Sequence, residues 1–249
     1  MSEMAIRVLD DEPLDGPTNM ARDEALLTLV GAGQSPPTLR LYQWSEPTIS
    51  LGYFQRYADY ASLPPPAGEL AVVRRPTGGG AILHDLELTY SISLPVGHPL
   101  LSRGPRALYE LAHDAVMSAL RGLDLAPARC GASDDSGAAR GPFFCFARRH
   151  CYDVLVGHDK IAGSAQRRTR RAVLQHGSIV IGNRFAQQPT AIAPQPFADA
   201  MLHLRAAYPE ALQSATRIPC HLGAWMSSEL PLVQDLVGKY GGLEWTRRT

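Results

Sequence analysis

The sequence predicts an α+β fold in which helices pack on a mixed β-sheet. Short apolar stretches of strand length recur along the 249 residues, and stretches with helical spacing of apolar residues lie between them. The two kinds of stretch do not alternate strictly, as they would in a parallel α/β fold. A chain of this size, with 45% hydrophobic and 19% charged residues, is typical of one large globular domain. We therefore expect a single domain over residues 1–249.

The predicted strands are short, rich in β-branched or aromatic residues and bounded by Pro, Gly or Ser. The first group is Leu39–Trp44, Thr48–Gly52, Leu70–Arg74 and Thr89–Leu94. The second group is Tyr152–Val156, Lys160–Ser164 and Val173–Ile181. Between the first two strands of this second group, Gly157-His158-Asp159 predicts a hairpin turn.

Helices are predicted from capping residues and apolar spacing. The first is capped by Thr18 or Asn19 and runs through Val30, and Pro105 opens a second that ends near Arg121. Two more are predicted: Phe197–Ala207, and a helix capped by Ser227 or Ser228 that ends at Gly241-Gly242. Two stretches are expected to be irregular: Leu63–Gly68, which contains three consecutive prolines, and the loop Ala126–Gly141.

The balance of charge argues against two classes of partner. The 24 basic and 24 acidic residues give a formal net charge of zero, whereas nucleic-acid and membrane-surface binders usually carry a basic excess. No run of 18 apolar residues occurs, and the N-terminus lacks a secretory signal, so we expect a cytoplasmic protein. The four cysteines lack paired CxxC spacing, so we expect neither a metal site nor a disulfide framework.

The densest local motif contains three consecutive glycines: Arg74-Arg75-Pro76-Thr77-Gly78-Gly79-Gly80-Ala81-Ile82-Leu83-His84-Asp85. Glycines after a strand let a ligand approach the backbone closely and leave amide groups free to bind it. The motif is neither a Walker phosphate loop nor a dinucleotide fingerprint, because the Lys-Ser/Thr pair and the third spaced glycine are missing. Taken alone, it is equally compatible with the tip of a hairpin.

Lysine is rare in this chain. Of the 24 basic residues, only Lys160 and Lys239 are lysines. A partly buried lysine can exchange its proton, which an arginine in a protein cannot. The small residues that follow Lys160 would let another group pack against it, although a solvated lysine at a hairpin turn is the simpler interpretation of this segment alone.

The sequence alone leaves the roles of three further features undecided. Cys145 lies between phenylalanines, and by itself it is more simply an inert core cysteine than a nucleophile. His176 precedes a glycine in an apolar strand, where a hydrogen-bonded core histidine is the common case. The run Arg167-Arg168-Thr169-Arg170-Arg171 is either a solvated turn or a docking patch for an acidic partner protein.

Taken together and in this order, these segments resemble the lipoate-protein ligase and octanoyltransferase superfamily, whose catalytic fold is shared with biotin ligases. The glycine motif with Leu88-Thr89-Tyr90-Ser91 is similar to the family's acyl-binding loop and strand, Lys160-Ile161-Ala162-Gly163-Ser164-Ala165-Gln166 to its lysine segment, and Leu174-Gln175-His176-Gly177-Ser178 to the strand that follows. The resemblance implies a central mixed, largely antiparallel sheet flanked by helices. It also implies one catalytic domain with no C-terminal accessory domain.

Within the superfamily, Cys145-Phe146 followed by Tyr152 and the lysine segment resembles the cysteine-dependent octanoyltransferases of the Bacillus type. The resemblance implies catalytic roles for Cys145 and Lys160. It implies substrate binding by Arg74, Thr77, Gly78, Gly79, Gly80, His84, Gly163, Ser164, Ala165, Gln166, His176 and Gly177. The implied donor is octanoyl-acyl carrier protein, and the acceptor is a lipoyl domain of the glycine cleavage H protein or of a 2-oxoacid dehydrogenase E2.

This implied reaction needs no cofactor, because the donor is already a thioester. Three alternatives stay open on sequence alone. An ATP-dependent lipoate-protein ligase would need ATP and Mg²⁺ and would not need Cys145. An amidotransferase that moves octanoyl or lipoyl groups between lipoyl domains would use the same cysteine. A catalytically silent module would bind lipoyl domains without transferring an acyl group.

Overall fold

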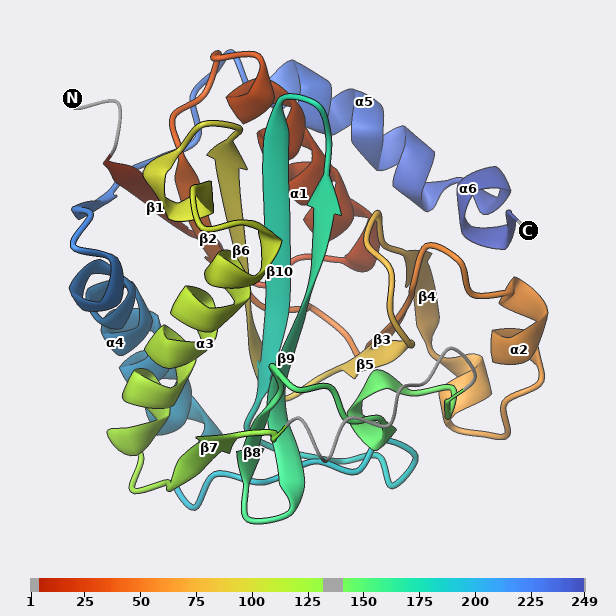
Figure 1. The fold of residues 1–249 in the computed structure, drawn as a ribbon. Helices are drawn as coiled ribbons and strands as arrows, with labels where there is room; N and C mark the ends of the chain where they lie inside the picture. The colour runs from red at the N-terminus through yellow and green to blue at the C-terminus, as the bar shows by residue number, and fades with distance from the viewer. Residues whose placement is uncertain (1–4, 132–140, 249) are drawn as a thin grey trace.

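The computed structural model describes residues 5–131 and 141–248, and its centre is a twisted mixed sheet (Figure 1). Within the described residues this sheet has eight strands in the order β11-β1-β2-β6-β10-β9-β8-β7. The strands are β1 Ile6–Asp10, β2 Thr38–Tyr42, β6 Glu87–Pro95, β7 Pro127–Arg129, β8 Val154–Val156, β9 Asp159–Arg168, β10 Ala172–Val180 and β11 Cys220–Leu222. Strand β1 runs parallel to both β2 and β11, and the pairs from β2 to β7 are antiparallel. The expected mixed, largely antiparallel sheet is confirmed.

A second, smaller sheet lies beside the first. Its described strands are β3 Thr48–Leu51, β4 Ala71–Arg74 and β5 Ile82–His84, in the order β4-β3-β5. Strand β3 pairs parallel to β4 and antiparallel to β5. The glycine motif therefore connects two strands of this small sheet, from the end of β4 to β5.

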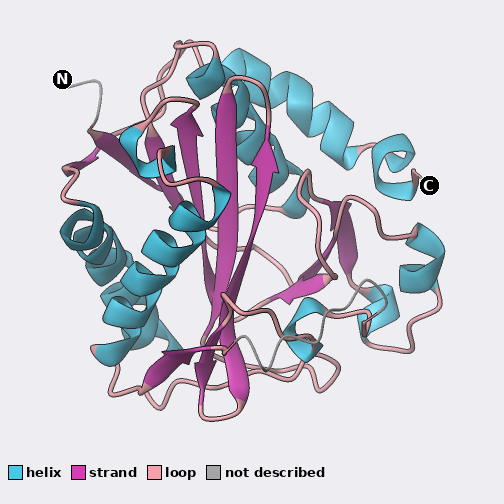
Figure 2. Cartoon of the chain, viewed as in Figure 1, coloured by secondary structure: helices cyan, strands magenta, loops and turns pink. Residues whose placement is uncertain are grey.

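Helices cover both faces of the main sheet (Figure 2). The α-helices are α1 Gly16–Gly31, α2 Tyr57–Ala61, α3 Pro105–Arg121, α4 Phe197–Thr216, α5 Leu230–Gly241 and α6 Leu243–Arg247. Alternate β10 residues point to opposite faces, as a strand requires. Val173 and Ile179 join the core beneath α3 and α4, whereas Leu174 packs against Leu27 of α1. The α1 side of β10 is also the side on which the small sheet lies (Figure 1).

Several element boundaries differ from the sequence-based expectation. Helix α1 begins before Thr18, because the Asp15 carboxylate accepts a hydrogen bond from the Thr18 amide at 2.8 Å and caps the first turn. Helix α4 continues past Ala207 and through Pro209 to Thr216. The predicted loop 126–141 contains β7, which pairs with β8, and the part of this loop from 132 to 140 lies outside the described residues. Among the described residues, no helix is both long and apolar enough to cross a bilayer.

Candidate active site

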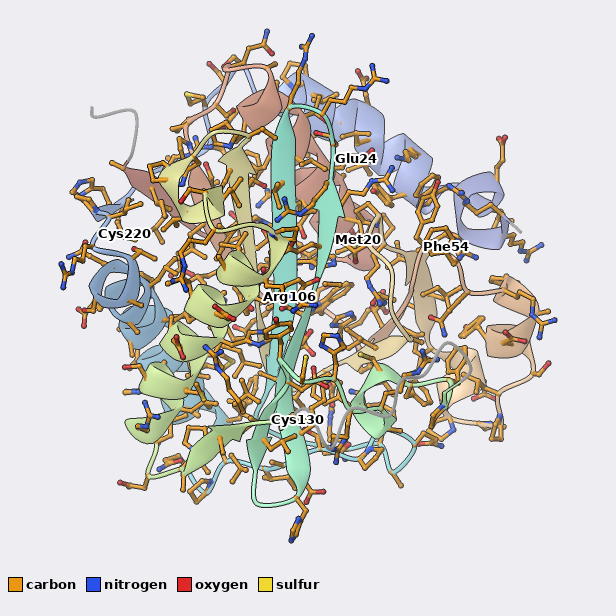
Figure 3. The ribbon with its side chains drawn as sticks, in the orientation of Figure 1. Met20, Glu24, Phe54, Arg106, Cys130 and Cys220 are labelled. Carbon is orange, nitrogen blue, oxygen red and sulfur yellow. The ribbon has the colours of Figure 1, made fainter. Side chains whose placement is uncertain are left out.

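An open cavity lies between the α1 side of the main sheet and the small sheet, with about 500 Å³ of empty space when its solvent-filled mouth is included. Apolar groups from α1, β2, β5 and the segment after residue 141 line it, among them Met20, Trp44, Ile82 and Phe146. In Figure 3, Met20 lies where α1 approaches the small sheet. The cavity brings together these predicted site residues: Gly79, His84, Cys145, Gly163, Ser164, Ala165, His176 and Gly177.

Cys145 is held at the cavity wall by the end of the glycine motif. It opens the short 3₁₀ turn Cys145–Ala147, and its amide donates a 2.7 Å hydrogen bond to the carbonyl of Ala81. The Ala81 amide in turn donates to the carbonyl of Phe143 at 2.9 Å. These two bonds fix the half-buried Cys145 thiol against the residues that follow the three glycines.

Lys160 joins Cys145 to a carboxylate. Its ammonium nitrogen lies 3.6 Å from the Cys145 sulfur and 2.8 Å from Oδ2 of Asp153. Lys160 is 2% exposed and Asp153 is 5% exposed. Burial alone would lower the pKa of Lys160, but the facing Cys145 and Asp153 outweigh burial and raise that pKa above its usual value. The lysine is therefore a cation at neutral pH, with a sulfur and a carboxylate as its partners.

The glycine of the lysine segment makes room for this arrangement. A Cβ atom at Gly163 would lie 2.6 Å from Cε and 2.8 Å from Nζ of Lys160. Both distances are too short for any real contact, so a side chain here would displace the ammonium from Cys145. This steric conflict explains why a glycine stands at position 163, next to the Lys160 ammonium.

Arg75 braces the glycine loop from beneath and lines the cavity. Its guanidinium donates to the carbonyls of Ser50, Gly78 and Gly80, at 2.8, 2.7 and 2.7 Å. Burial lowers the pKa of Arg75 to about 10, so the side chain still carries its charge at neutral pH. A buried cation thus sets the shape of the loop on which Cys145 is anchored.

His176 belongs to a second buried chain of hydrogen bonds. Its Nδ1 lies 3.1 Å from a carboxylate oxygen of Asp23, and its Nε2 lies 2.6 Å from the hydroxyl of Thr77. Burial alone would raise the pKa of Asp23, but the bonds from His176 and Arg40 lower it, so Asp23 is a carboxylate. This chain of hydrogen bonds connects α1, β10 and the glycine loop, and it links Thr77 to His176, which lines the cavity.

His84 also lines the cavity. Its ring stacks on Trp44 with centroids 3.9 Å apart, its Nδ1 bonds to Glu87 at 2.8 Å, and its Nε2 bonds to Ser50 at 2.7 Å. Burial lowers the pKa of His84 despite the neighbouring Glu87, which favours the neutral ring. An aromatic, neutral wall of this kind suits an apolar ligand.

Two predicted site residues point elsewhere. The Arg74 guanidinium donates to backbone carbonyls of Gly52, Gln55, Thr246 and Arg248, so it ties the C-terminal segment to the small sheet. Gln166 bonds to the carbonyl of Pro105 and to Gln175. The backbone of Gly78 and Gly80 serves the loop by accepting from Arg75.

Sequence reasoning missed Asp153, Arg75 and Asp23 as members of the site. Asp153 and Arg75 lie inside segments already singled out, so the only available signal was proximity to them. Asp23 lies on a helix about 150 residues from His176, and nothing local connects the two. The other three cysteines do not line the cavity: Cys130 follows β7, Cys151 precedes β8, and Cys220 lies on β11. Cys130 and Cys220 lie far apart in Figure 3, and burial raises the pKa of Cys220 to about 11.

The arrangement of the two sheets defines the class of the protein. It is similar to lipoate-protein ligase A solved with bound ATP, with a TM-score of 0.75 and 22% identity over 98% of this chain and 99% of that one. It is also similar to a bi-partite lipoate protein ligase from Thermoplasma acidophilum, with a TM-score of 0.70 and 22% identity over 98% and 96% of the two chains. At such identities, the likeness establishes a lipoate-protein ligase fold.

The sequence then fixes the family. Residues 15–214 match the lipoyl protein ligase A/B catalytic domain, and the chain belongs to that family. It is 43% identical over 180 residues to the octanoyltransferase LipM of Moorella thermoacetica, covering 70% of this chain and 64% of that protein. It is 38% identical over 186 residues to the LipM of Geobacillus kaustophilus, covering 73% and 67%. The aligned part thus spans just under two thirds of the Moorella relative, and the predicted superfamily is confirmed.

Proposed function

We propose that the protein is a protein N-octanoyltransferase of lipoate biosynthesis. It moves an octanoyl group from octanoyl-acyl carrier protein to Cys145, and then to the acceptor lysine of a lipoyl domain. The observation that carries this proposal is the 3.6 Å contact between the Lys160 ammonium and the Cys145 sulfur at the wall of the cavity. The LipM relatives named octanoyltransferases support the reaction class. The reaction would take place in the cytoplasm without ATP or a metal ion.

In the first half-reaction, the Cys145 thiolate attacks the thioester carbonyl of the donor. The bond between that carbonyl carbon and the carrier's sulfur breaks, and the carrier leaves as a thiolate that takes a proton from water. The ammonium of Lys160 stabilises the attacking thiolate and the negative oxygen of the tetrahedral intermediate. An acyl thioester on Cys145 remains.

In the second half-reaction, the neutral amine of the acceptor lysine attacks this thioester. The amide bond forms, the bond from carbon to the Cys145 sulfur breaks, and the electron pair stays on sulfur. The amine releases its proton to water. The raised pKa of Lys160 supports an electrostatic role for this lysine and argues against its acting as the base in the resting enzyme.

The cavity would hold the acyl chain. Burying a chain of about eight carbons at roughly 0.8 kcal/mol per methylene gives several kcal/mol of chain-length selection. The end of β9 and the turn to β10 carry the exposed Arg167–Arg171 run, and Arg167 lies 5.2 Å from the ring centroid of Tyr53. This arginine run would dock an acidic carrier or acceptor domain. The T. acidophilum ligase was analysed with its E2 lipoyl domain, which supports a lipoyl domain as acceptor.

Intact-protein mass spectrometry tests the proposal. The wild type and Cys145→Ser are mixed with octanoyl-acyl carrier protein in the absence of ATP, and Cys151→Ser serves as the matched cysteine control. We expect an octanoyl adduct that hydroxylamine removes on the wild type and on Cys151→Ser, and none on Cys145→Ser, whose transfer rate falls by about 10³-fold or more. An unmodified wild type that instead catalyses lipoate-dependent ATP–pyrophosphate exchange would establish the ligase and make Cys145 a structural residue.

A further inference from the structure

Acylation of Cys145 changes the charge around Lys160. Before acylation, the lysine faces two groups that favour its protonated form, Cys145 and Asp153. A thioester is neutral, so once the acyl group is on sulfur, Asp153 is the one remaining partner among the described residues that favours the charged lysine. Burial continues to oppose the charge on Lys160, because the side chain is 2% exposed.

The other described groups packed around Lys160 cannot replace the contribution of Cys145. His113 faces it from α3, and burial lowers the pKa of this histidine to about 4, so it is neutral near pH 7. The ring of Phe146 lies 5.1 Å from the ammonium and offers a weak cation–π contact. Arg75 faces Cys145 as a cation.

Hydrogen bonds hold the Asp153 carboxylate in place beside Lys160. Its Oδ2 accepts a 2.9 Å hydrogen bond from the amide of His150 as well as the 2.8 Å bond from Lys160. The Asp153 amide donates back to the His150 carbonyl at 2.8 Å, and its own carbonyl accepts from the amide of Cys130. The carboxylate therefore stays in place whether or not Cys145 carries an acyl group.

We propose that Asp153 is a positioning residue that keeps Lys160 protonated in the acyl-enzyme, so that the second half-reaction depends on Asp153 more than the first. This inference rests on the proposed transferase. In that step, the acceptor amine forms the C–N bond, the C–S bond breaks with its electrons on sulfur, and the amine proton goes to water. A thiolate then appears beside Lys160, and it leaves readily only if the lysine is already an ammonium.

The protonation of Lys160 can be measured without any substrate. The chain has only two lysines, so protein labelled with ¹³C,¹⁵N-lysine gives two side-chain NMR signals, which Lys239→Arg assigns. The wild type and Asp153→Asn are alkylated with iodoacetamide, which leaves Cys145 as an uncharged thioether, and are titrated from pH 6 to pH 10. Asp159→Asn, an exposed carboxylate at the start of the same strand, is the matched control.

We expect Lys160 in the alkylated wild type and in alkylated Asp159→Asn to stay protonated beyond pH 8.5. In alkylated Asp153→Asn, its midpoint should fall by at least one pH unit, which is about tenfold in the equilibrium. Equal midpoints in the alkylated wild type and alkylated Asp153→Asn would overturn the proposal. If Asp153→Asn does not fold, the alkylated wild type still decides, because a midpoint below pH 8 with Asp153 present contradicts the role.

Separate half-reactions give the second readout. Loading from octanoyl-acyl carrier protein and unloading to a lipoyl domain are followed by single-turnover mass spectrometry. In Asp153→Asn, we expect unloading to slow at least about tenfold more than loading, with the deficit growing as pH rises from 7 to 9. Equal slowing of both steps with an unchanged pH profile would mean that Asp153 is merely structural. If the wild type never loads an acyl group, the proposed function fails, while the lysine titration still tests Asp153.

Discussion

Two of the buried clusters of polar and charged side chains among the described residues satisfy their charges differently. In the cysteine cluster of Cys145, Lys160 and Asp153, the lysine has one short bond to a carboxylate and one long contact to sulfur, 2.8 against 3.6 Å. In the arginine cluster of Asp11, Asp23 and Arg40, the guanidinium donates to both carboxylates at 2.5 and 3.0 Å.

The arginine cluster is also saturated by neutral partners. Arg40 donates to the side-chain oxygen of Asn19 at 2.6 Å and lies 3.9 Å from the ring centroid of Tyr42. Its carboxylate Asp23 further accepts from Tyr42 and Ser91, at 3.0 and 2.7 Å. Burial of charge therefore does not by itself mark a reactive site. The arginine cluster also reaches the cavity, through Tyr42 and His176, so the distinguishing feature of the cysteine cluster is a nucleophile that is only weakly bonded.

The largest expected effect is on the rate when the ammonium of the cysteine cluster is removed. Lys160→Met takes away the charge that stabilises the thiolate and the oxyanion, so we expect octanoyl transfer to fall by about 10²–10³-fold. Single-turnover loading of the acyl group measures this loss.

Lys239→Met is the matched control, because Lys239 is the other lysine of the chain. Its ammonium pairs with the Glu24 carboxylate at 2.5 Å and has no contact with Cys145 among those of the described residues. Transfer by this variant should stay within about twofold of the wild type. A Lys160→Met enzyme that loads octanoate at the wild-type rate would remove Lys160 from the mechanism and make its cluster as passive as the arginine cluster.

Disrupting the arginine cluster should instead lower the free energy of unfolding. Arg40→Met leaves Asp11 and Asp23 buried without their shared cation, which destabilises a protein by about 3–5 kcal/mol. Urea denaturation at pH 7 measures the difference in the free energy of unfolding.

Arg22→Met provides the comparison, since Arg22 also binds Asp11, at 2.7 Å, but is 17% exposed and leaves Arg40 in place. We expect it to lose about 1 kcal/mol or less. If Arg40→Met and Arg22→Met unfold at the same urea concentration, the buried arginine adds nothing beyond a partly exposed ion pair, and the comparison between the clusters fails.

The sequence predicts the long strands of the fold, but of the described three-residue strands it predicts only β8, through the hairpin turn to β9. Strands β6, β9 and β10 have nine, ten and nine residues, and the three motifs lie on or beside them. Strands β5, β7 and β11 have three residues each, which is too short for a period to be recognised. Each depends on a partner strand for its conformation, so local sequence does not predict it.

The neighbouring arginines show why the site is harder to predict than the fold. Arg74 and Arg75 are adjacent and both buried, yet Arg74 binds the C-terminal backbone and Arg75 braces the glycine loop. Successive residues at a strand end point to opposite sides, and the motif does not say which side faces the cavity. Cys145 and Lys160 were predicted because the resemblance names them. Asp153 needed the structure, because its role comes from one distance to Lys160.

A third buried group, His113, sharpens the comparison because it is buried without a charge. It lies on α3 behind the cysteine cluster, where its Nε2 is 2.8 Å from the Ser164 hydroxyl and its Nδ1 bonds to the Tyr152 carbonyl. Burial lowers its pKa from 6.5 to about 4, against the opposing effects of that carbonyl and of Asp153. As pH falls below 6.5, His113 therefore binds a proton in the unfolded chain but stays neutral in the folded protein. The stability that His113 contributes is fully present above pH 6.5 and is lost between pH 6.5 and about 4.

At pH 5, this linkage amounts to roughly 2 kcal/mol, at about 1.4 kcal/mol per pH unit. Urea denaturation at pH 7 and pH 5 should show that loss in the wild type and in His221→Gln, a histidine exposed on β11. In His113→Gln, the two pH values should differ by about 2 kcal/mol less, because glutamine does not titrate. Should His113→Gln lose as much stability on acidification as the wild type, the acid sensitivity would belong to other groups, and the α3 side of the cysteine cluster would tolerate a charge.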